Sequence, residues 1–433
     1  WKRYQQVWGQ FYNAADKIGF AHGYGTLREQ ASQASHCTNI GRVHRRMIHP
    51  LFERWFGIQV AESDEYSHPR KPEELVCLTE KARGELRPKS LTEVMSAIGL
   101  ERIDAARRRL AGKADAERRQ LLRDDWSRLL GPVTPVAPPV IKRTSLDDQP
   151  VAGAKVERLV LEAEPGIWVP VVVLSPVKAT GRALAVVGVA QAGKAGFVQQ
   201  RGPELLTLVQ HGAIVVLPDL RGTGESRTGS SRGRDSGATN LSVRVQLFGE
   251  TLLGQRLRDL RSVLVYLRER RDVDPQRIAL WGDSFAPPNP ADTDFQIPHG
   301  VDGWPQESEP LGGLLALLGA LFEDEIRAVY VAGGLNEYHA VLTHFAVLIP
   351  HDGSVPGALT AGDLCDLAGS LTPKPVCLEA LVDHLNRTVS AAEMLRAYAP
   401  AVQAYAATPQ ALSLEETRSS SAVADCAESR RAL

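Results

Sequence analysis

The sequence predicts an open α/β fold, with a mostly parallel sheet that carries helices on both faces. Two observations predict this class. Apolar runs typical of strands buried on both faces recur after residue 150, and stretches with helical periodicity separate them. This alternation implies parallel strands joined by right-handed crossovers. Ligands of such sheets bind beyond the carboxyl ends of the strands, so we expect the functional site there.

The first 131 residues predict a mainly helical extension. Residues 100–130 place apolar side chains at helical spacing among many charges. Acidic residues interleave the arginines of 107–123 and no aromatic residues accompany them, which favours a solvated helix face over a nucleic-acid surface. The segment "GPVTPVAPPV" holds four prolines in ten residues. It predicts a linker at 132–144, followed by an α/β domain at 145–433.

The expected strands follow in order after the linker. Residues 155–176 read as two strands around a turn, and each later strand is a short apolar run. The stretches between them, 202–212 and 245–270, have leucines at helical spacing. The later predicted strands are "RALAVVGVAQ" (182–191), "GAIVVLPDL" (212–220), "RIALWGD" (277–283), "IRAVYVAGG" (326–334), "KPVCLEALVD" (374–383) and "QALSLE" (410–415).

Composition argues against several classes of protein. The 433 residues carry a formal net charge of -1, so no global field favours nucleic acid or an anionic membrane. No apolar run approaches the length of a membrane span, and the sequence starts at Trp1 without a basic-then-apolar leader, so we expect neither a span nor a signal peptide. The five cysteines are scattered, without a C-x-x-C pair. We therefore expect no metal site, and oligomeric state stays open.

The strand ends bring candidate catalytic side chains to one edge. Ser284 follows the "RIALWGD" run within Gly282-Asp283-Ser284-Phe285-Ala286, which has the small residues that a nucleophile elbow needs on each side of its serine. The alternative is that Ser284 only caps a helix. The other polar residues after strands are Gln191, Asp219, Arg221, Asn336, Glu337, Asp383 and His384.

The stretches "VVLPDLRGTGES" (215–226) and "VDPQRIALWGDSF" (273–285) together resemble the α/β-hydrolase superfamily. The similar branch contains acetyl xylan esterases, dienelactone-hydrolase-like enzymes and prolyl-oligopeptidase-type peptidases, and the resemblance covers roughly residues 145–415. It implies Ser284 as nucleophile and Asp383 as acid. It also implies the backbone N–H groups of Phe285 and Ala192 as oxyanion-hole donors, with Gln191 and Arg221 bordering the substrate pocket.

The sequence departs from this pattern within the elbow. Residues 286–310, "APPNPADTDFQIPHGVDGWPQESEP", intervene before "LGGLLALLGALFEDE", which has the Gly-Gly and apolar face of the expected elbow helix. Their prolines disfavour regular structure. Trp304 and its apolar neighbours predict a lid or substrate wall, and the alternative is a surface excursion.

The sequence also lacks the family's usual base, because no histidine follows "QALSLE". A serine without a base is a poor nucleophile, so another histidine serves it or the domain is catalytically silent. We favour His351, in an irregular segment on the catalytic edge, with His384 and His299 as alternates. His211 lies at the wrong edge, and His339 and His344 lie in an apparent helix. The acid is Asp383 or, as second choice, Glu337.

Residues 20–57 resemble the closing segment of another α/β-hydrolase unit, with "HGY" followed by a helix ending in "RWF". This resemblance makes His22 a remote candidate base. The alternative is an N-terminal helical extension that packs on the core.

The resemblance implies acyl transfer from an ester to water through an acyl-enzyme on Ser284, without a cofactor. It points to an esterified carbohydrate as substrate and to a secreted or periplasmic location. One alternative is a catalytically silent module that binds carbohydrate or a protein. Another is a prolyl-oligopeptidase-type peptidase, although no propeller repeats precede the domain.

Overall fold

The computed structural model describes residues 1–22, 40–59, 70–147, 149, 151–178, 181–227, 229, 236–296, 304–419 and 421–428. The chain divides into two compact units, Trp1–Pro88 and Lys89–Leu433. The boundary therefore lies before residues 100–130 and not at the proline-rich segment 132–144. Within the described residues, no helix is long and apolar enough to span a bilayer.

The first unit is helical where it is described. Its longest helix, α2, contains Pro50, and the side chain of Trp55 on α2 donates a hydrogen bond to the Asp16 carbonyl at 3.0 Å. His22 belongs to this unit, and most of the adjoining "HGYGTLREQ" stretch lies outside the described residues. The α-helices of this unit are α1 (Lys2–Gln6), α2 (Arg42–Phe56) and α3 (Glu80–Leu86).

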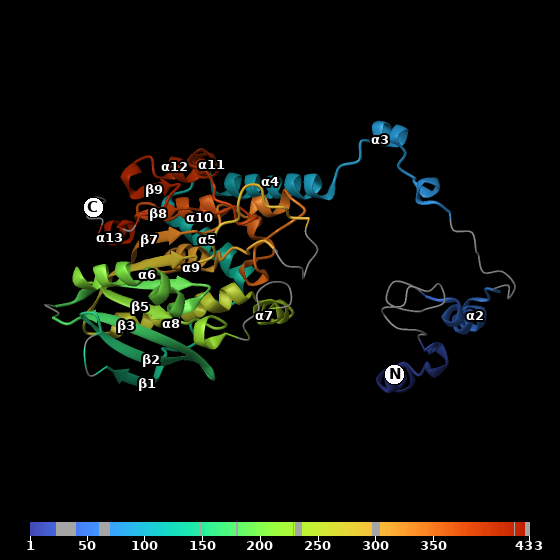
Figure 1. The fold of residues 1–433 in the computed structure, drawn as a ribbon, viewed down its shortest axis with the longest axis horizontal. Helices are drawn as coiled ribbons and strands as arrows, with labels where there is room; N and C mark the ends of the chain where they lie inside the picture. Colours follow the sequence, from blue (N-terminus) through green and yellow to red (C-terminus); the bar gives the residue numbers. More distant parts are fainter. Residues whose placement is uncertain are drawn as a thin grey trace. The chain divides into compact units, whose positions relative to one another are not determined.

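A nine-stranded sheet forms the centre of the second unit, in the order β1-β2-β3-β5-β4-β6-β7-β8-β9 (Figure 1). The pairs β1–β2, β2–β3 and β3–β5 are antiparallel, and every later pair is parallel. The predicted mostly parallel sheet is thus confirmed. The strands are β1 (Val140–Leu146), β2 (Ala154–Glu164), β3 (Ile167–Pro176), β4 (Ala183–Ala190), β5 (Ile214–Pro218), β6 (Val273–Asp283), β7 (Ile326–Ala332), β8 (Val376–Glu379) and β9 (Leu412–Glu415).

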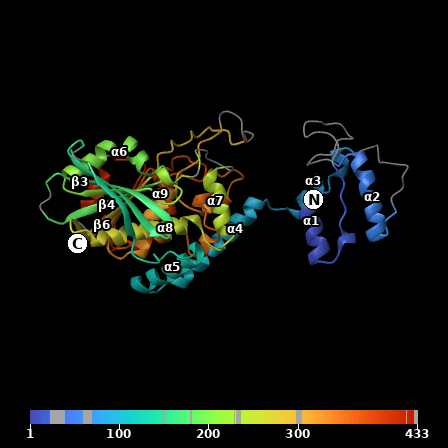
Figure 2. The same cartoon turned by 90° about the horizontal axis from the view of Figure 1, so that it is seen from below.

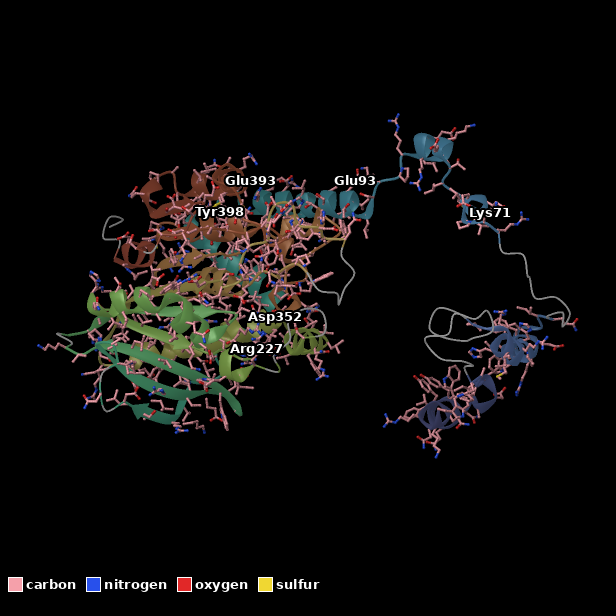
Figure 3. All side chains as sticks on the ribbon, in the orientation of Figure 1. Lys71, Glu93, Arg227, Asp352, Glu393 and Tyr398 are labelled. Atoms are coloured by element: carbon pink, nitrogen blue, oxygen red, sulfur yellow. The ribbon has the colours of Figure 1, made fainter. Side chains whose placement is uncertain are left out.

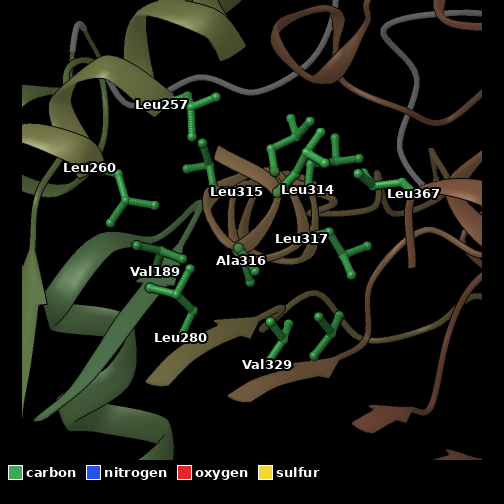
Figure 4. Packing of buried hydrophobic residues seen from close by; sticks show 14 of the residues in the cluster. Val189, Leu257, Leu260, Leu280, Leu314, Leu315, Ala316, Leu317, Val329 and Leu367 are labelled. Carbon is green, nitrogen blue, oxygen red and sulfur yellow. The ribbon is translucent and has the colours of Figure 1, made fainter. Parts of the chain in front are cut away.

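Helices cover both faces of this sheet (Figures 1 and 2). Helices α8 (Leu252–Glu269) and α9 (Leu311–Phe322) pack on one face, where their leucines meet Val189, Leu280 and Val329 (Figure 4). Helices α6 (Gly193–Gln210) and α13 (Ala422–Glu428) pack on the other. Burial on both sides explains why the central strands are almost wholly apolar.

The single helix expected over 245–270 is two helices. Helix α7 (Gly237–Gln246) ends, a turn follows, and α8 begins after Thr251. The Thr251 hydroxyl accepts a hydrogen bond from the Gly254 N–H at 3.0 Å, which caps the new helix. Leucine spacing predicted α8 correctly but continues past this break.

Helices α4 (Leu91–Leu110) and α5 (Asp115–Leu130) belong to the second unit and not to the extension. Trp126 and Leu130 of α5 are each 1% exposed and belong to the main core. The Thr251 N–H donates to the Leu130 carbonyl at 3.0 Å. The proline-rich segment leads directly into β1, which the sequence did not suggest.

The remaining helices of the second unit lie after β7. They are α10 (Leu364–Gly369), α11 (Ala391–Ala397) and α12 (Ala399–Ala404).

Candidate functional site

Ser284 lies at the carboxyl end of β6, between the ends of β4 and β7. Strand register pairs Asp283 with Ala190 on β4 and with Ala332 on β7, so Gln191 and Gly333 flank Ser284. The Ser284 N–H donates to the Ala332 carbonyl at 3.1 Å. A Cβ on Gly333, whose φ is 67°, would stand 2.9 Å from the Ser284 Cβ. Ser284 therefore lies at the carboxyl edge, where the sequence predicted it.

The elbow is split between β6 and α9. A Cβ on Gly282 would stand 2.2 Å from the Gly312 carbonyl oxygen, so strand and helix make the close approach that an elbow requires. In the sequence, residues 286–310 lie between these two glycines. Ser284 is not among the described non-glycine residues with positive φ, and its N–H continues the ladder to β7. Ser284 therefore lacks the strained backbone that is typical of the nucleophile in an elbow.

The buried Asp283 side chain fixes the approach to Ser284. It pairs with Arg201 at 3.0 Å and with Arg418 at 2.8 Å. It also accepts hydrogen bonds from the Trp281 indole at 3.0 Å and from the Ser284 N–H at 2.9 Å. Sequence reasoning missed this cluster, because its two arginines lie 82 and 135 residues from the carboxylate.

The side chains of the two residues expected to supply oxyanion donors both lie beside Gly196. A Cβ on Gly196 would stand 2.7 Å from both the Ala192 Cβ and the Phe285 ring, so these two residues converge over α6. The Phe285 N–H, however, donates to the Glu309 carboxylate at 2.8 Å, and Glu309 is 1% exposed. An internal carboxylate therefore occupies one donor. The only sequence signal for Glu309 was an acidic residue directly before the Gly-Gly helix.

A buried polar cluster adjoins Gln191. The Gln191 amide donates to Asp352 at 2.8 Å, and Arg256 pairs with the same Asp352 oxygen at 2.6 Å (Asp352 is labelled in Figure 3). Gln191 Oε1, Asp352 Oδ1 and Arg256 Nη2 have no hydrogen-bond partner among the described residues. Arg221 supports this cluster through its backbone carbonyl, which accepts from Arg256 Nε at 2.9 Å.

The Arg221 side chain is committed elsewhere. Its guanidinium pairs with Asp259 and Glu164. The Arg221 N–H also donates to Asp259 at 3.0 Å. Arg221 therefore holds the β5 turn together, and the guanidinium is not free to bind a substrate in this arrangement.

His351 begins a short 3-10 turn against the end of the insertion. A Cβ on Gly353 in this turn would stand 3.0 Å from Pro310 Cγ. His351 Nδ1 lies 3.1 Å from the Ser242 hydroxyl, which donates to the His351 carbonyl at 3.3 Å. One arrangement of protons satisfies both contacts, with Nδ1–H donating to the hydroxyl oxygen. In that tautomer His351 Nε2 carries a lone pair, as a base requires.

Asp383 is not paired with a histidine. Its carboxylate accepts hydrogen bonds from the Arg387 N–H, the Arg387 side chain and the Leu385 N–H, each at 2.9 Å. These contacts close a turn after β8. The acid implied by the resemblance thus lies at the expected place but orders a loop in this structure.

His384 is 7% exposed, and neither ring nitrogen has a partner among the described residues. Burial lowers the pKa of His384, and nearby His344 and Arg387 lower it further against the opposite effect of Asp383. The ring of His344 lies 5.8 Å away. His344 is not in a helix as expected, because the 3-10 turn that begins at His339 ends at Leu342.

The other predicted site residues are less closely tied to Ser284. Burial raises the pKa of Glu337, and Asp363 raises it further. Trp304 is 37% exposed, and His299 lies outside the described residues. Among the described residues, the Ser284 hydroxyl makes no hydrogen bond and no cluster of three metal-ligating side chains occurs.

Both described ends of the insertion fold back over the turn after β8. The Asn289 N–H donates to the Asn386 carbonyl at 2.7 Å, and the Asn289 amide donates to the Leu385 carbonyl at 2.8 Å. Asn386 returns a hydrogen bond to the Pro287 carbonyl at 2.9 Å. The Gln306 N–H reaches Asn289 at 2.9 Å. These contacts tie both described ends of the insertion to the turn after β8.

Comparison with known proteins establishes the fold. No protein-family model and no curated protein sequence matches the chain. A solved structure assigned as an acetyl xylan esterase from Bacteroides fragilis is similar with a TM-score of 0.52 and 14% identity, over 71% of this chain and 77% of that one. The methylesterase BT1017 is similar with a TM-score of 0.51 and 20% identity, over 77% of this chain and 68% of that one. The fold is that of the α/β-hydrolases.

Proposed function

We propose that this chain, as an α/β-hydrolase fold, hydrolyses carboxylic esters of a carbohydrate with Ser284 as its nucleophile. Ser284 has the position in the sheet that the nucleophile of this fold occupies, and Phe285 and Ala192 converge beside it. The names of the two similar structures, an acetyl xylan esterase and a methylesterase, agree with ester hydrolysis.

The observation that supports a carbohydrate is the distribution of unpartnered polar atoms. Of the ten buried side-chain atoms without a partner in the described chain, seven lie at the carboxyl edge of the sheet. Buried polar atoms are rarely unpaired, so such a concentration indicates a site for a polar ligand. Sugar hydroxyls suit a mixture of donors and acceptors, because each hydroxyl both donates and accepts. The seven atoms are Gln191 Oε1, Arg256 Nη2, Asp352 Oδ1, Asn336 Oδ1, His384 Nδ1, His384 Nε2 and Asn386 Oδ1.

The proposed reaction begins when the Ser284 hydroxyl attacks the ester carbonyl and gives its proton to a histidine. His351 is the proposed base, because the Ser242 hydroxyl orients its Nδ1 and leaves Nε2 free. The carbonyl oxygen becomes an oxyanion between the N–H groups of Phe285 and Ala192. The sugar oxygen leaves as a free hydroxyl group after it takes the proton from the histidine. Water then attacks the acyl-enzyme and releases the acid from Ser284 by the same steps.

This reaction requires the insertion to move. Glu309 occupies the Phe285 N–H, and the unpartnered atoms are shielded from solvent. An N–H that donates to this carboxylate is not available to a developing oxyanion. We therefore propose that residues 286–310 act as a lid whose displacement withdraws Glu309 and opens the site.

A second candidate function is a hydrolase-fold module that binds carbohydrate without hydrolysing it. Two observations favour it: the Glu309 carboxylate on the Phe285 N–H, and a Ser284 hydroxyl that no described histidine contacts. The carboxyl edge of the sheet with the seven unpartnered atoms would then bind sugar. Ser284 would have no chemical role.

Hydrolysis of p-nitrophenyl acetate and of acetylated xylan by the wild type and by Ser284→Ala distinguishes the two. The esterase predicts a fall in kcat/KM of at least about a thousandfold in Ser284→Ala. The substitution Ser413→Ala, at a partly buried position on the edge strand β9 of the same sheet, should leave activity unchanged. Xylan binding without hydrolysis by the wild type would favour the binding module.

A further inference from the structure

A cavity lies between α4 and the segments that follow β7. Its volume is about 340 Å³, within the usual range of small-molecule pockets. Met95 and Ile98 of α4 form one wall, and Val341, Val347 and Ile349 form part of the other. Figure 1 shows α4 beside the orange segments of this region. The site belongs wholly to the second unit.

The lining of this cavity is almost entirely apolar. Met95, Ile98 and Val347 are 39%, 40% and 39% exposed, so large hydrophobic side chains remain in contact with solvent at its mouth. Such exposure on a folded surface is costly unless a ligand covers it. At about 30 Å³ for each water-sized group, the cavity accepts a body of about ten non-hydrogen atoms.

Arg102 supplies the only formal charge in the lining. It forms no ion pair with another described residue, whereas Arg107 on the same helix pairs with Asp366 at 2.8 Å. Its helix neighbours at three and four positions, Ile98, Gly99, Ala105 and Ala106, cannot neutralise it. An uncompensated cation at an apolar cavity matches a ligand with an apolar body and one negative group.

We propose that this cavity binds a small amphipathic carboxylate, with its apolar body among Val341, Val347 and Ile349 and its carboxylate beside Arg102. Apolar contact supplies most of the affinity, because an ion pair at an exposed arginine contributes little. Arg102 supplies the preference for an anion. None of the residues that line this cavity has a role in the proposed ester hydrolysis, so the test of this site does not depend on that reaction.

Calorimetric titration of the full chain with octanoate and with the neutral 1-octanol tests the proposal. The wild type should bind both and prefer octanoate. Arg102→Gln should weaken octanoate binding about two- to fivefold and leave octanol binding unchanged. Arg108→Gln, an exposed arginine on the same helix that does not line the cavity, is the matched control and should change neither.

A second variant tests the cavity itself. Val341→Phe fills part of the space and should weaken both ligands about tenfold, while an unchanged melting temperature shows that the fold is intact. The proposal is wrong if the wild type binds neither ligand, if Val341→Phe binds both normally, or if Arg102→Gln and Arg108→Gln behave alike. None of these ligand affinities or melting temperatures depends on esterase activity.

Discussion

At the scale of single residues, Glu309 separates the catalytic from the non-catalytic interpretation. Its carboxylate accepts the Phe285 N–H at 2.8 Å, where an ester oxyanion would bind. The same contact stabilises the closed arrangement, because Glu309 is buried and satisfies a backbone donor. Stability and activity are therefore expected to respond to Glu309 in opposite directions.

Glu309→Ala should raise kcat for p-nitrophenyl acetate on the order of tenfold, because it frees the Phe285 N–H. It should also lower the free energy of unfolding by about 1–3 kcal/mol, because the donor loses its partner. Steady-state kinetics and urea unfolding measure the two effects. Glu269→Ala, at the exposed end of α8, should change neither, and a fall in kcat in Glu309→Ala would show that the carboxylate assists the reaction.

His384 should make stability depend on pH. Burial holds its pKa in the folded protein below the ordinary value of 6.5, so the folded state keeps the ring neutral while the unfolded chain protonates it. The unfolded state then binds more protons, and the contribution of His384 to stability is lost as pH falls below 6.5. Urea unfolding between pH 7 and pH 5 should show a shallower loss for His384→Gln than for the wild type. Identical slopes would contradict the burial of a neutral ring.

At the scale of elements, the insertion turns one elbow into two separate pieces. Gly282 and Gly312 still make the close strand-to-helix contact, although residues 286–310 lie between Ser284 and α9. Asn289 links the two ends of this insertion to the turn after β8. The described ends of the insertion and the turn after β8 therefore form one hydrogen-bonded layer.

Asn289→Ala should loosen this layer. The substitution leaves the Leu385 carbonyl and the Gln306 N–H without their partner, so we expect unfolding to need about 1–3 kcal/mol less free energy. Hydrogen exchange should rise in residues 304–310 and 384–387 and stay unchanged in β4 and β6. Uniform protection in the variant would show that Asn289 does not hold the insertion in place.

The sequence predicted the strands from β2 onward and the position of Ser284 at a strand end, because buried strands need continuous apolar runs and the elbow needs small residues; β1 was missed. It could not predict the partners of the polar side chains. The contacts of Asp283 with Arg201 and Arg418, and of Phe285 with Glu309, join residues far apart in the chain. Asp383 follows β8 as expected, yet local hydrogen bonds to Leu385 and Arg387 take its carboxylate.

At the scale of the whole molecule, α4 and α5 complete the main core of the second unit. Charged residues dominate their sequences, which suggested a separate extension, but Leu122, Trp126 and Leu130 pack into the main core. Arginines on their polar faces pair with acidic residues of the sheet domain, as Arg107 does with Asp366. The amino-acid composition of a helix does not show which part of the protein its apolar face packs against.

A chain that begins at Lys89 should unfold at the same temperature as the full chain, because the second unit keeps its core. Within it, Trp126→Ala should lower the free energy of unfolding by about 3–5 kcal/mol, as expected for a large buried aromatic side chain. Leu91→Ala, at a position 76% exposed on α4, should change it by less than about 0.5 kcal/mol. A Trp126→Ala effect as small as that of Leu91→Ala would place α5 outside the core.

The most direct test of the central proposal is the site of reaction with a fluorophosphonate, which labels activated serines covalently. Incubation of the full chain with this reagent, followed by mass spectrometry of its peptides, should give one adduct on Ser284. Ser284→Ala should give none. Absence of an adduct in the wild type, or an adduct on another residue such as Ser242, would contradict Ser284 as the nucleophile.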